Sequence, residues 1–323
     1  MSKVSVVMAT YNGEKFIEEQ LESIRQQSRA VDEVLIADDC STDRTVEVIR
    51  NFIDKYKLQH WFVTVNQKNV GWKRNFTNLI FQASGDIIFY CDQDDIWFSN
   101  KVDVMASVLE ENKQIFCLSS HYISIDSKGR ILNQGLDVKA LETGTLSRIS
   151  IDDRRFFYVP AGCTLAFRSQ LLSFMDYNFC ECGTDRILVR TAILLNSMYD
   201  IDLSLIKHRF HENNASNSIN NLKEYYGSST LIDRIQYVKE DLLYFESLKK
   251  FRNIFNEEYV NFFDISKKRF KILNNKNVLL LFTLLCQNKP KFIKIIVLGD
   301  FLYSIGLNRC IGRLCRYMRI NFK

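Results

Sequence analysis

Short apolar runs alternate with amphipathic stretches through the first 112 residues. Four runs rich in β-branched and aromatic residues predict strands at 3–9, 31–37, 61–65 and 87–91. Apolar residues recurring every three or four positions predict helices at 14–27, 46–56, 71–83 and 101–111. Strand and helix therefore alternate in units of ~30 residues, which indicates right-handed crossovers and a parallel sheet.

From residue 113 the pattern becomes mixed. Strands predicted at 115–125 and 131–132 flank a hairpin turn signal, Asp126-Ser-Lys-Gly129. The stretch 154–168 is typical of strand, turn and strand, 184–196 of a helix, and 203–206 of a short strand. The fold class is therefore predicted to be α/β, with a mostly parallel sheet flanked by helices.

Beyond residue 221 the chain becomes helical. Apolar residues from Leu231 to Phe251 follow three- and four-residue spacing, which predicts an amphipathic helix that packs on the body or pairs between chains. We expect a domain at 1–221, with halves 1–112 and 113–221, and a helical, basic C-terminal region at 222–323. The longest apolar stretch, Val278 to Cys286, is far below the ~20 residues that span a bilayer.

Composition, cysteine spacing and the N-terminal sequence together predict where in the cell the protein is found. Of 323 residues 46% are hydrophobic and 25% charged, which is ordinary for a globular protein. The nine cysteines are scattered and form no C-x-x-C pair, which favours reduced thiols over disulfides or a zinc site. The chain enters its first predicted strand with no secretory signal pattern, so a cytoplasmic location is expected.

The net charge of +5 is unevenly distributed. Residues 267–323 contain 13 Lys and Arg and one acidic residue, Asp300. Such a basic region suggests an anionic partner, either nucleic acid or a membrane surface. The stretch 309–320 alternates basic with apolar residues, which suits an anionic membrane surface. No recognised nucleic-acid motif accompanies it.

Three carboxylates, Asp92, Asp94 and Asp95, follow the predicted strand 87–91 directly. Ligands of open parallel sheets bind outside the carboxyl ends of strands. Clustered carboxylates need a counter-charge, and a divalent cation such as Mg²⁺ or Mn²⁺ would supply one through oxygen ligands. The alternative is an exposed acidic turn that caps the next helix.

Polar residues also follow the first two strands, as Thr10-Tyr11-Asn12-Gly13 and as Asp38-Asp39. Neither the G-x-G-x-x-G dinucleotide fingerprint nor a Walker A loop is present, which argues against dehydrogenases and P-loop proteins. Later come Gly183-Thr184-Asp185 and His208-Arg209-x-His211-x-Asn213-Asn214.

These segments occur together and in order, and over residues 3–217 the chain resembles the inverting family-2 glycosyltransferases of the GT-A fold. It looks most like the branch that builds bacterial surface polysaccharides, several members of which transfer rhamnose. The resemblance implies that Asp94 is a direct metal ligand. It also implies that Asp92 meets the ribose or a metal-bound water, and that His211 is a further ligand or a hydrogen-bond donor to the diphosphate.

The resemblance also implies a donor site. By this resemblance, Thr10, Tyr11 and Asn12 are expected to lie against the nucleoside of the donor. Asp39 is expected to accept a hydrogen bond from N3–H of uracil or thymine. UDP and dTDP donors therefore stay equally open. Asn69 is assigned to the donor site as well. Lys73 and Arg74, at the start of the helix predicted after Gly71, are candidates for phosphate binding, and a solvated basic helix start is the alternative. Arg209 is expected to clamp diphosphate oxygens.

The expected catalytic base is Asp185, at the start of a predicted helix. Family members usually place an acidic residue or His before this aspartate, where this chain has Thr184. Glu181 is therefore kept as the alternative base. A third interpretation makes Asp185 a helix cap.

These resemblances predict a metal-dependent, inverting enzyme. It would move a sugar from a UDP- or dTDP-sugar, dTDP-rhamnose among the candidates, onto a lipid-linked oligosaccharide in surface or capsular polysaccharide synthesis. It would work at the inner face of the cell membrane, held there by its basic C-terminal region. The alternatives are a non-catalytic nucleotide-sugar-binding scaffold and a nucleic-acid binder with salt-sensitive affinity.

Overall fold

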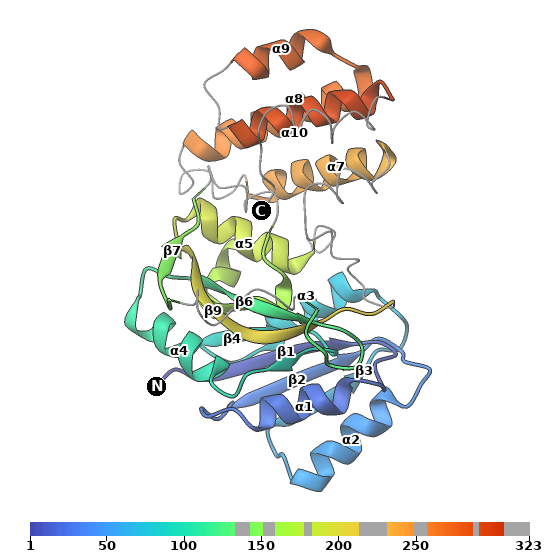
Figure 1. Cartoon of the computed structure of the whole chain (residues 1–323), viewed down its shortest axis with the longest axis vertical. Helices are drawn as coiled ribbons and strands as arrows, with labels where there is room; N and C mark the ends of the chain where they lie inside the picture. The colour runs from blue at the N-terminus through green and yellow to red at the C-terminus, as the bar shows by residue number, and fades with distance from the viewer. Residues whose placement is uncertain are drawn as a thin grey trace. The chain divides into compact units, whose positions relative to one another are not determined.

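The computed structural model describes residues 1–132, 143–150, 159–177, 183–212, 231–248, 257–286 and 291–306. The chain divides into two compact units, Met1–Glu212 and Asn213–Lys323, which are described separately below (Figure 1). The predicted domain boundary at residue 221 falls in 213–230, outside the described residues.

One sheet organises the first unit, and the described residues contribute nine strands to it in the order β3-β2-β1-β4-β8-β6-β9-β5, with β7 paired to β9. The strands are β1 Val4–Thr10, β2 Glu33–Asp38, β3 Trp61–Val65, β4 Ile87–Cys91, β5 Ile96–Trp97, β6 Cys117–Ile125, β7 Leu146–Arg148, β8 Leu165–Arg168 and β9 Met198–Arg209. Strands β1 to β4 pair in parallel, whereas β8 is antiparallel to both β4 and β6. The predicted α/β class is confirmed.

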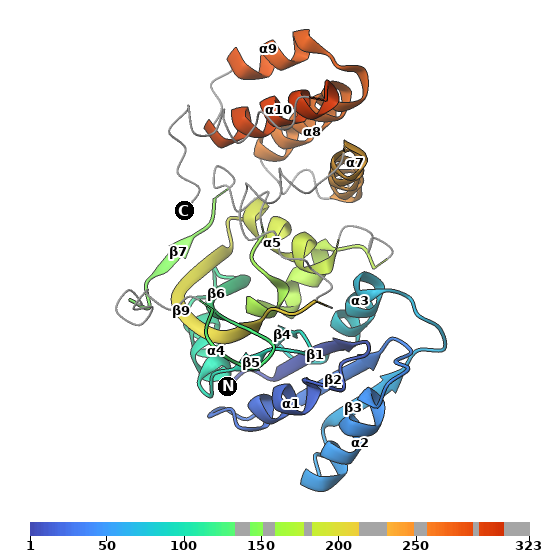
Figure 2. The same cartoon turned by 45° about the vertical axis from the view of Figure 1, so that its right-hand side comes forward.

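Helices cover both faces of this sheet. They are α1 Ile17–Arg25, α2 Thr45–Tyr56, α3 Trp72–Gln82, α4 Lys101–Glu111 and α5 Thr184–Leu194. Alternate residues of β4 face opposite sides: Ile87, Phe89 and Cys91 join the core under α1, α2 and α4. Tyr90 points the other way and stacks on Phe76 of α3 with ring centroids 3.8 Å apart. Figures 1 and 2 show α1 and α2 on one face of the sheet and α3 and α5 on the other.

Strand β9 is three times as long as the predicted 203–206. It pairs in parallel with β6 and antiparallel with β5 and β7. Polar residues near both ends of β9, such as Asp200, His208 and Arg209, interrupt the apolar pattern. The sequence therefore predicted only the central part of the strand. His208 and Arg209 therefore lie on a strand, next to the carboxylates that follow β4.

Three smaller predictions had different outcomes: one changed, one is confirmed and one can be followed only in part. Helix α1 begins at Ile17 rather than at residue 14, because Gly13 O accepts the N–H groups of Phe16 and Ile17 and forms a turn first. The hairpin turn after Ile125 is present, and Ile125 bridges Ile131. Of the predicted strand–turn–strand at 154–168, only β8 and the short helix before it can be followed, since 151–158 lie outside the described residues.

The described part of the second unit is helical. It contains α7 Leu231–Ser247, α8 Glu257–Asn275, α9 Val278–Cys286 and α10 Lys291–Ser304. Among the described residues, none of these helices is both long enough and apolar enough to cross a bilayer. The basic stretch 309–320 lies outside the described residues.

A buried charge network ties this unit together. Asp300, the acidic residue of the basic region, is fully buried and accepts bonds from Arg234 and from Nε of Arg269 at 2.7 Å. Arg269 also lies 3.6 Å from Asp241. At least one of the basic residues counted after 267 is therefore internal and does not face a partner.

Candidate active site

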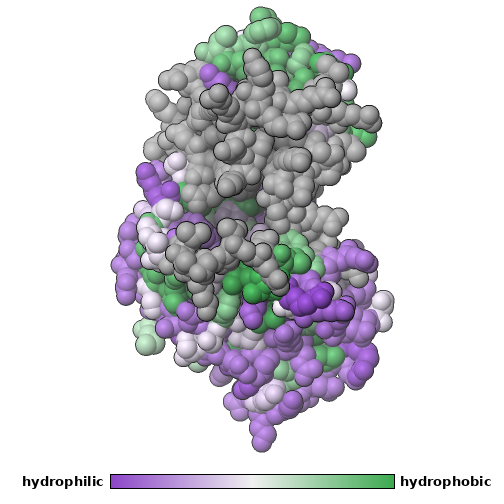
Figure 3. All heavy atoms as spheres, viewed as in Figure 1, coloured by the Kyte–Doolittle hydropathy of each residue, from purple (hydrophilic) through white to green (hydrophobic). Residues whose placement is uncertain are grey.

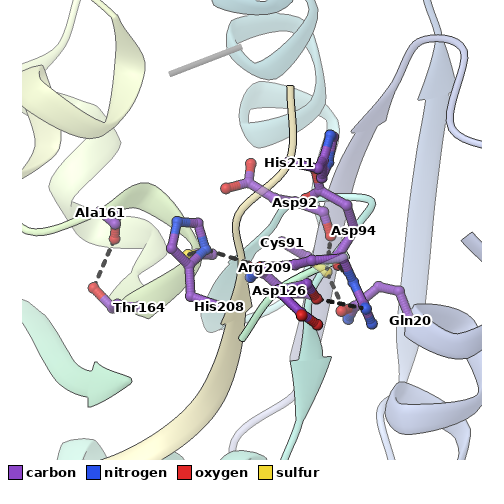
Figure 4. Close-up of polar contacts among 12 residues, drawn as sticks. Gln20, Cys91, Asp92, Asp94, Asp126, Ala161, Thr164, His208, Arg209 and His211 are labelled. Carbon is purple, nitrogen blue, oxygen red and sulfur yellow. Dashed lines mark hydrogen bonds and ion pairs between the residues drawn. The ribbon is translucent and has the colours of Figure 1, made fainter. Parts of the chain in front are cut away.

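The three carboxylates that follow β4 diverge in direction and burial. Asp94 is 8% exposed, and its Oδ2 lies 2.8 Å from Nε2 of His211. Asp92 is only partly buried, whereas Asp95 is fully buried. Figure 4 shows Asp92, Asp94 and His211 grouped together, with His208 pointing to the other side of β9. The structure therefore pairs two of the predicted metal ligands, Asp94 and His211, and places Asp92 in their neighbourhood.

Asp95 connects this group to β9. Its Oδ1 accepts the backbone N–H of Arg209 at 2.9 Å and faces Nδ1 of His208 at 2.9 Å. The hydrogen bond from His208 lowers the pKa of Asp95 against the opposing effect of burial, and Asp95 in turn raises the pKa of His208 to about 9. The pair therefore favours the protonated form of His208, whose ring N–H faces the Asp95 carboxylate.

A buried lysine at the start of α4 also lies near Asp95. Lys101 is 0% exposed, donates from Nζ to the Cys163 carbonyl at 2.6 Å, and places Nζ 4.1 Å from the Trp97 ring centroid. Burial lowers the pKa of its ammonium to about 8. The cluster thus contains protein cations that partly offset its carboxylates, which the sequence did not indicate.

The guanidinium of Arg209 is held by protein groups. It is 2% exposed and donates to Glu19 Oε2 at 2.5 Å, to the Asp94 carbonyl at 2.8 Å and to the Asp126 carbonyl at 3.3 Å. These bonds fix the turn that carries Asp94. Its predicted role as a diphosphate clamp would require these bonds to be exchanged for bonds to phosphate.

The open side of the cluster fits a divalent cation. Burial and the nearby negative charges of Asp95 and Asp94 raise the pKa of Asp92 to about 8, so the site favours added positive charge there. Asp94 and His211 offer an oxygen and a ring nitrogen beside it. These donors suit Mn²⁺ or Mg²⁺ with water completing the shell.

A second group of ligand atoms fits a metal less well. Among the described residues, Asp95, Cys163 and His208 place ligand atoms within 4.8 Å of one another, all buried. Burial raises the pKa of the Cys163 thiol well above its ordinary value, so it stays protonated, and His208 already donates to Asp95. This trio is a hydrogen-bonded core that holds the two motifs together.

The predicted nucleoside residues lie at the ends of β1 and β2. Tyr11 is 48% exposed, and its backbone N–H and carbonyl are both bonded by the Gln93 side chain, at 2.9 and 3.0 Å. Thr10 is buried and donates to Asp38 at 2.9 Å, while Asn12 accepts the Thr42 N–H at 2.8 Å. Sequence reasoning missed Gln93, although it stands between the carboxylates.

Asp39 anchors the loop before α3. Its Oδ1 accepts bonds from Asn66 and the Val70 N–H, and its Oδ2 accepts the Gly71 N–H at 2.8 Å. Asn69 donates to the Asp39 carbonyl at 3.1 Å. A carboxylate offers about four acceptor positions, so one position on Asp39 remains for a base N3–H.

The start of α3 carries the predicted phosphate residues. Lys73 is its second residue, and the Lys73 carbonyl accepts the hydroxyls of Thr77 and Thr184 at 2.8 and 3.3 Å. Arg74 turns away and donates to the Tyr177 carbonyl at 3.1 Å. Arg74, one of the two predicted phosphate-binding side chains, is therefore hydrogen-bonded to protein.

Asp185 lies in the first turn of α5, after Gly183 with φ of 81°. Its Oδ1 accepts the next N–H, of Arg186, at 2.8 Å, and burial raises its pKa. Thr184, where relatives usually carry an acid or His, has its hydroxyl 3.0 Å from that of Thr77 on α3. Thr184, the residue that departs from the family pattern, therefore contacts α3. The alternative base, Glu181, lies outside the described residues.

Asp185 and the carboxylates after β4 share the same end of the sheet. A Cβ built on Gly162 would lie 2.8 Å from Cε1 of Tyr90 and 3.4 Å from Cβ of Asp185. Tyr90 is two residues before Asp92, so the glycine lets Asp185 approach the end of β4. The structure therefore brings the expected base and the expected metal ligands to one edge.

Comparison with known proteins agrees with this arrangement. Residues 5–173 match the family description "Glycosyl transferase family 2". A dTDP-rhamnosyl transferase, RfbG of Shigella flexneri, is 32% identical over 248 residues, which cover 72% of this chain and 81% of that protein. The poly(ribitol-phosphate) beta-N-acetylglucosaminyltransferase TarS of Staphylococcus aureus is 28% identical over 183 residues, 56% of this chain but only 30% of TarS.

Solved structures agree on the fold. Residues 1–349 of TarS with UDP-GlcNAc superpose with a TM-score of 0.60 at 20% identity, over 96% of this chain and 87% of that one. The same protein with UDP gives 0.59 at 18% identity, over 99% and 94%. The predicted resemblance to family-2 glycosyltransferases of the GT-A fold is therefore confirmed. The chain belongs to glycosyl transferase family 2 and is a glycosyltransferase.

Proposed function

We propose that the chain is an inverting, metal-dependent glycosyltransferase that takes its sugar from a UDP- or dTDP-sugar. One observation carries the proposal: Asp94 pairs with His211 at the end of β4 with Asp92 nearby, and Asp185 lies at the same edge of the sheet. A metal bound by Asp94 and His211, with Asp92 beside it, would supply Lewis-acid stabilisation of the departing diphosphate.

Asp185 is the proposed base. Its raised pKa makes the carboxylate a stronger proton acceptor than an exposed aspartate, which favours removal of a proton from an acceptor hydroxyl. The acceptor oxygen then attacks the anomeric carbon in one displacement, as the diphosphate leaves on the opposite face. No covalent link to the enzyme forms, so the configuration inverts.

In this proposal some of the predicted donor residues contact the nucleotide directly, and others hold the loops around it. Tyr11, exposed and fixed through Gln93, offers its ring to the base, while Asp39 accepts N3–H at its remaining position. Lys73 lies near the diphosphate. Asn69 and Arg209 position the loops around the donor through their bonds to Asp39 and Asp94.

For the acceptor we propose a lipid-linked saccharide at an anionic membrane surface. Helix α9 supports this, because Val278, Leu279 and Phe282 are 45%, 78% and 59% exposed on it. Figure 3 shows hydrophobic residues gathered over α9. Lys276 precedes this helix, and an apolar face beside basic residues suits an anionic interface. Sedimentation with phosphatidylglycerol vesicles tests it: Leu279→Ser with Phe282→Ser should reduce binding.

The enzyme itself is tested by donor turnover. A panel of UDP- and dTDP-sugars is incubated with wild type in Mn²⁺, Mg²⁺ or EDTA, with membrane lipid extract as acceptor. Turnover of one donor should require metal and fall at least a hundredfold in Asp94→Ala and in Asp185→Asn. Asp103→Asn is the matched control, because Asp103 is an exposed first-turn aspartate of α4. Metal-independent turnover would overturn the metal assignment, and nucleotide binding without turnover of any donor would favour the scaffold alternative.

A further inference from the structure

An exposed aromatic ring lies beside the proposed base. Trp72, the first residue of α3, is 43% exposed. The chain has three tryptophans, and the other two, Trp61 and Trp97, are 9% and 3% exposed. A large aromatic side chain usually contributes by burying 150–250 Å², so one left half in solvent invites a binding role.

Gly183 shows how close the ring is to Asp185. A Cβ built on this glycine would lie 3.2 Å from Cη2 of Trp72 and 3.0 Å from Oδ1 of Asp185. The indole edge and the carboxylate oxygen therefore border the same small space. The positive φ of Gly183 favours glycine there, and glycine keeps that space free of side-chain atoms.

The two helices that carry these groups are fixed to each other. The hydroxyls of Thr77 on α3 and Thr184 on α5 are 3.0 Å apart, and Figures 1 and 2 show the two helices side by side. Trp72 is thus held on a rigid element at a set distance from Asp185. Nζ of Lys73 lies over the ring at 5.8 Å from its centroid, at the outer limit of a cation–π contact, and 43% of the Trp72 side chain remains exposed.

We propose that Trp72 is the stacking platform of the acceptor site, on which a pyranose ring of the acceptor places its C–H face. The proposal rests on the proposed function, in which Asp185 receives the acceptor proton. The face of an indole carries negative charge density, and the C–H groups of one pyranose face carry slight positive charge, so the two attract and exclude water. A hydroxyl at the ring edge then points toward Asp185.

This arrangement selects a class of acceptor. A cyclic sugar presents a flat apolar face that matches an indole, whereas an acyclic polyol such as ribitol presents none. The ring borders the same space as the oxygen of the proposed base, which assigns it to the acceptor side of the site. Trp72 would therefore favour a saccharide acceptor over a polyol phosphate.

Fluorescence tests the contact directly. Because Trp72 is the exposed tryptophan, acrylamide quenching of the protein chiefly reports its accessibility. With UDP and Mn²⁺ present, methyl α-L-rhamnopyranoside, methyl β-D-glucopyranoside and methyl N-acetyl-β-D-glucosaminide are added in turn. At least one should reduce the quenching constant about twofold, and ribitol should not. No protection by any pyranoside, or equal protection by ribitol, would overturn the proposal.

Kinetics provide the second test, with the best protecting pyranoside as acceptor. Trp72→Ala should raise the KM for that acceptor about tenfold, and far more than the KM for the donor in hydrolysis by water. Trp72→Phe should recover most of the loss. Phe62→Ala is the matched control, since Phe62 is 49% exposed on the distant edge strand β3.

The outcomes separate this proposal from the one on which it rests. If wild type hydrolyses no donor, the proposed function fails and protection by pyranosides still tests the platform. If wild type is active and Trp72→Ala raises the donor KM as much as the acceptor KM, the ring contacts the donor, and the acceptor platform is wrong.

Discussion

Replacing the buried Lys101 by methionine should stabilise the first unit. Lys101 is fully buried at the start of α4, within electrostatic reach of Asp92 and Asp95. Burial disfavours its ammonium and lowers its pKa from 10.5 to about 8, although Cys163, Cys91, Asp95 and Asp92 partly oppose this. Methionine has similar length and no charge, so it removes the desolvation cost.

The size of the effect follows from the pKa. A shift from 10.5 to about 8 corresponds to about 3 kcal/mol against the charged form, at 1.36 kcal/mol per pKa unit. Methionine also loses the 2.6 Å bond to the Cys163 carbonyl, and a buried carbonyl left unpaired costs about 1–2 kcal/mol. We therefore expect a net gain of about 1–2 kcal/mol in the free energy of unfolding at pH 7.

The pH dependence gives a sharper test. Because the folded-state pKa of Lys101 lies below the unfolded value, the unfolded chain binds more protons between pH 8 and 10.5. Wild type should therefore gain stability from this group as the pH rises through that window. Lys101→Met should lack that gain, so the advantage of the variant at pH 7 should shrink by pH 10.

Urea unfolding followed by tryptophan fluorescence measures this, because all three tryptophans lie in the first unit. The exposed Lys113→Met is the control for loss of a lysine at the surface. A Lys101→Met variant less stable than wild type by more than about 1 kcal/mol, with an unchanged pH profile, would refute the reasoning. It would mean that attraction to the carboxylates outweighs the cost of burial.

Two further predictions concern contacts at the edges of the site and the fold. The two bonds from Arg29 hold the pKa of Glu110 at about 2, so this pair stabilises the fold above pH 4.5 and loses its effect as the pH falls toward 2. Glu110→Gln should cost about 1 kcal/mol at pH 7 and nothing near pH 2, in urea titrations at both values. Gly13→Ala would place a Cβ 2.3 Å from Gln93 Oε1 and break the bond to the Tyr11 N–H, so UDP affinity should fall about tenfold by calorimetry. Unchanged affinity would show that this bridge does not shape the nucleotide site.

The sequence predicted the parallel half of the fold closely, because its strands appear as continuous apolar runs, and β1 and β4 are buried almost throughout. Strands β3 and β4 match their predicted ranges residue for residue, and β1 and β2 differ by one or two positions. Strand β9 was predicted at a third of its length. Its buried polar residues, His208 and Arg209, look like loop residues until their partners are known.

The candidate site could be predicted only in part. Motif order and family resemblance grouped Asp92, Asp94, Asp185 and His211, because the carboxyl ends of parallel strands share one edge. Neither Lys101 nor Trp72 could be found that way. Each depends on an approach between segments distant in sequence, such as the contact of Lys101 with residue 163 or of Trp72 with residue 183.

The bonds from β9 also determine the order in which the site can form. Arg209 bonds Glu19 across 190 positions of sequence, and His208 bonds Asp95 across 113. During synthesis the four parallel strands β1 to β4 are complete long before β9 leaves the ribosome, and closing such long loops is slow. In that interval Asp94 and Asp95 lack the groups that later hold them. The nucleotide half therefore acquires its final site geometry last, and a chain that stalls before residue 208 would have the sheet's first four strands without an assembled centre.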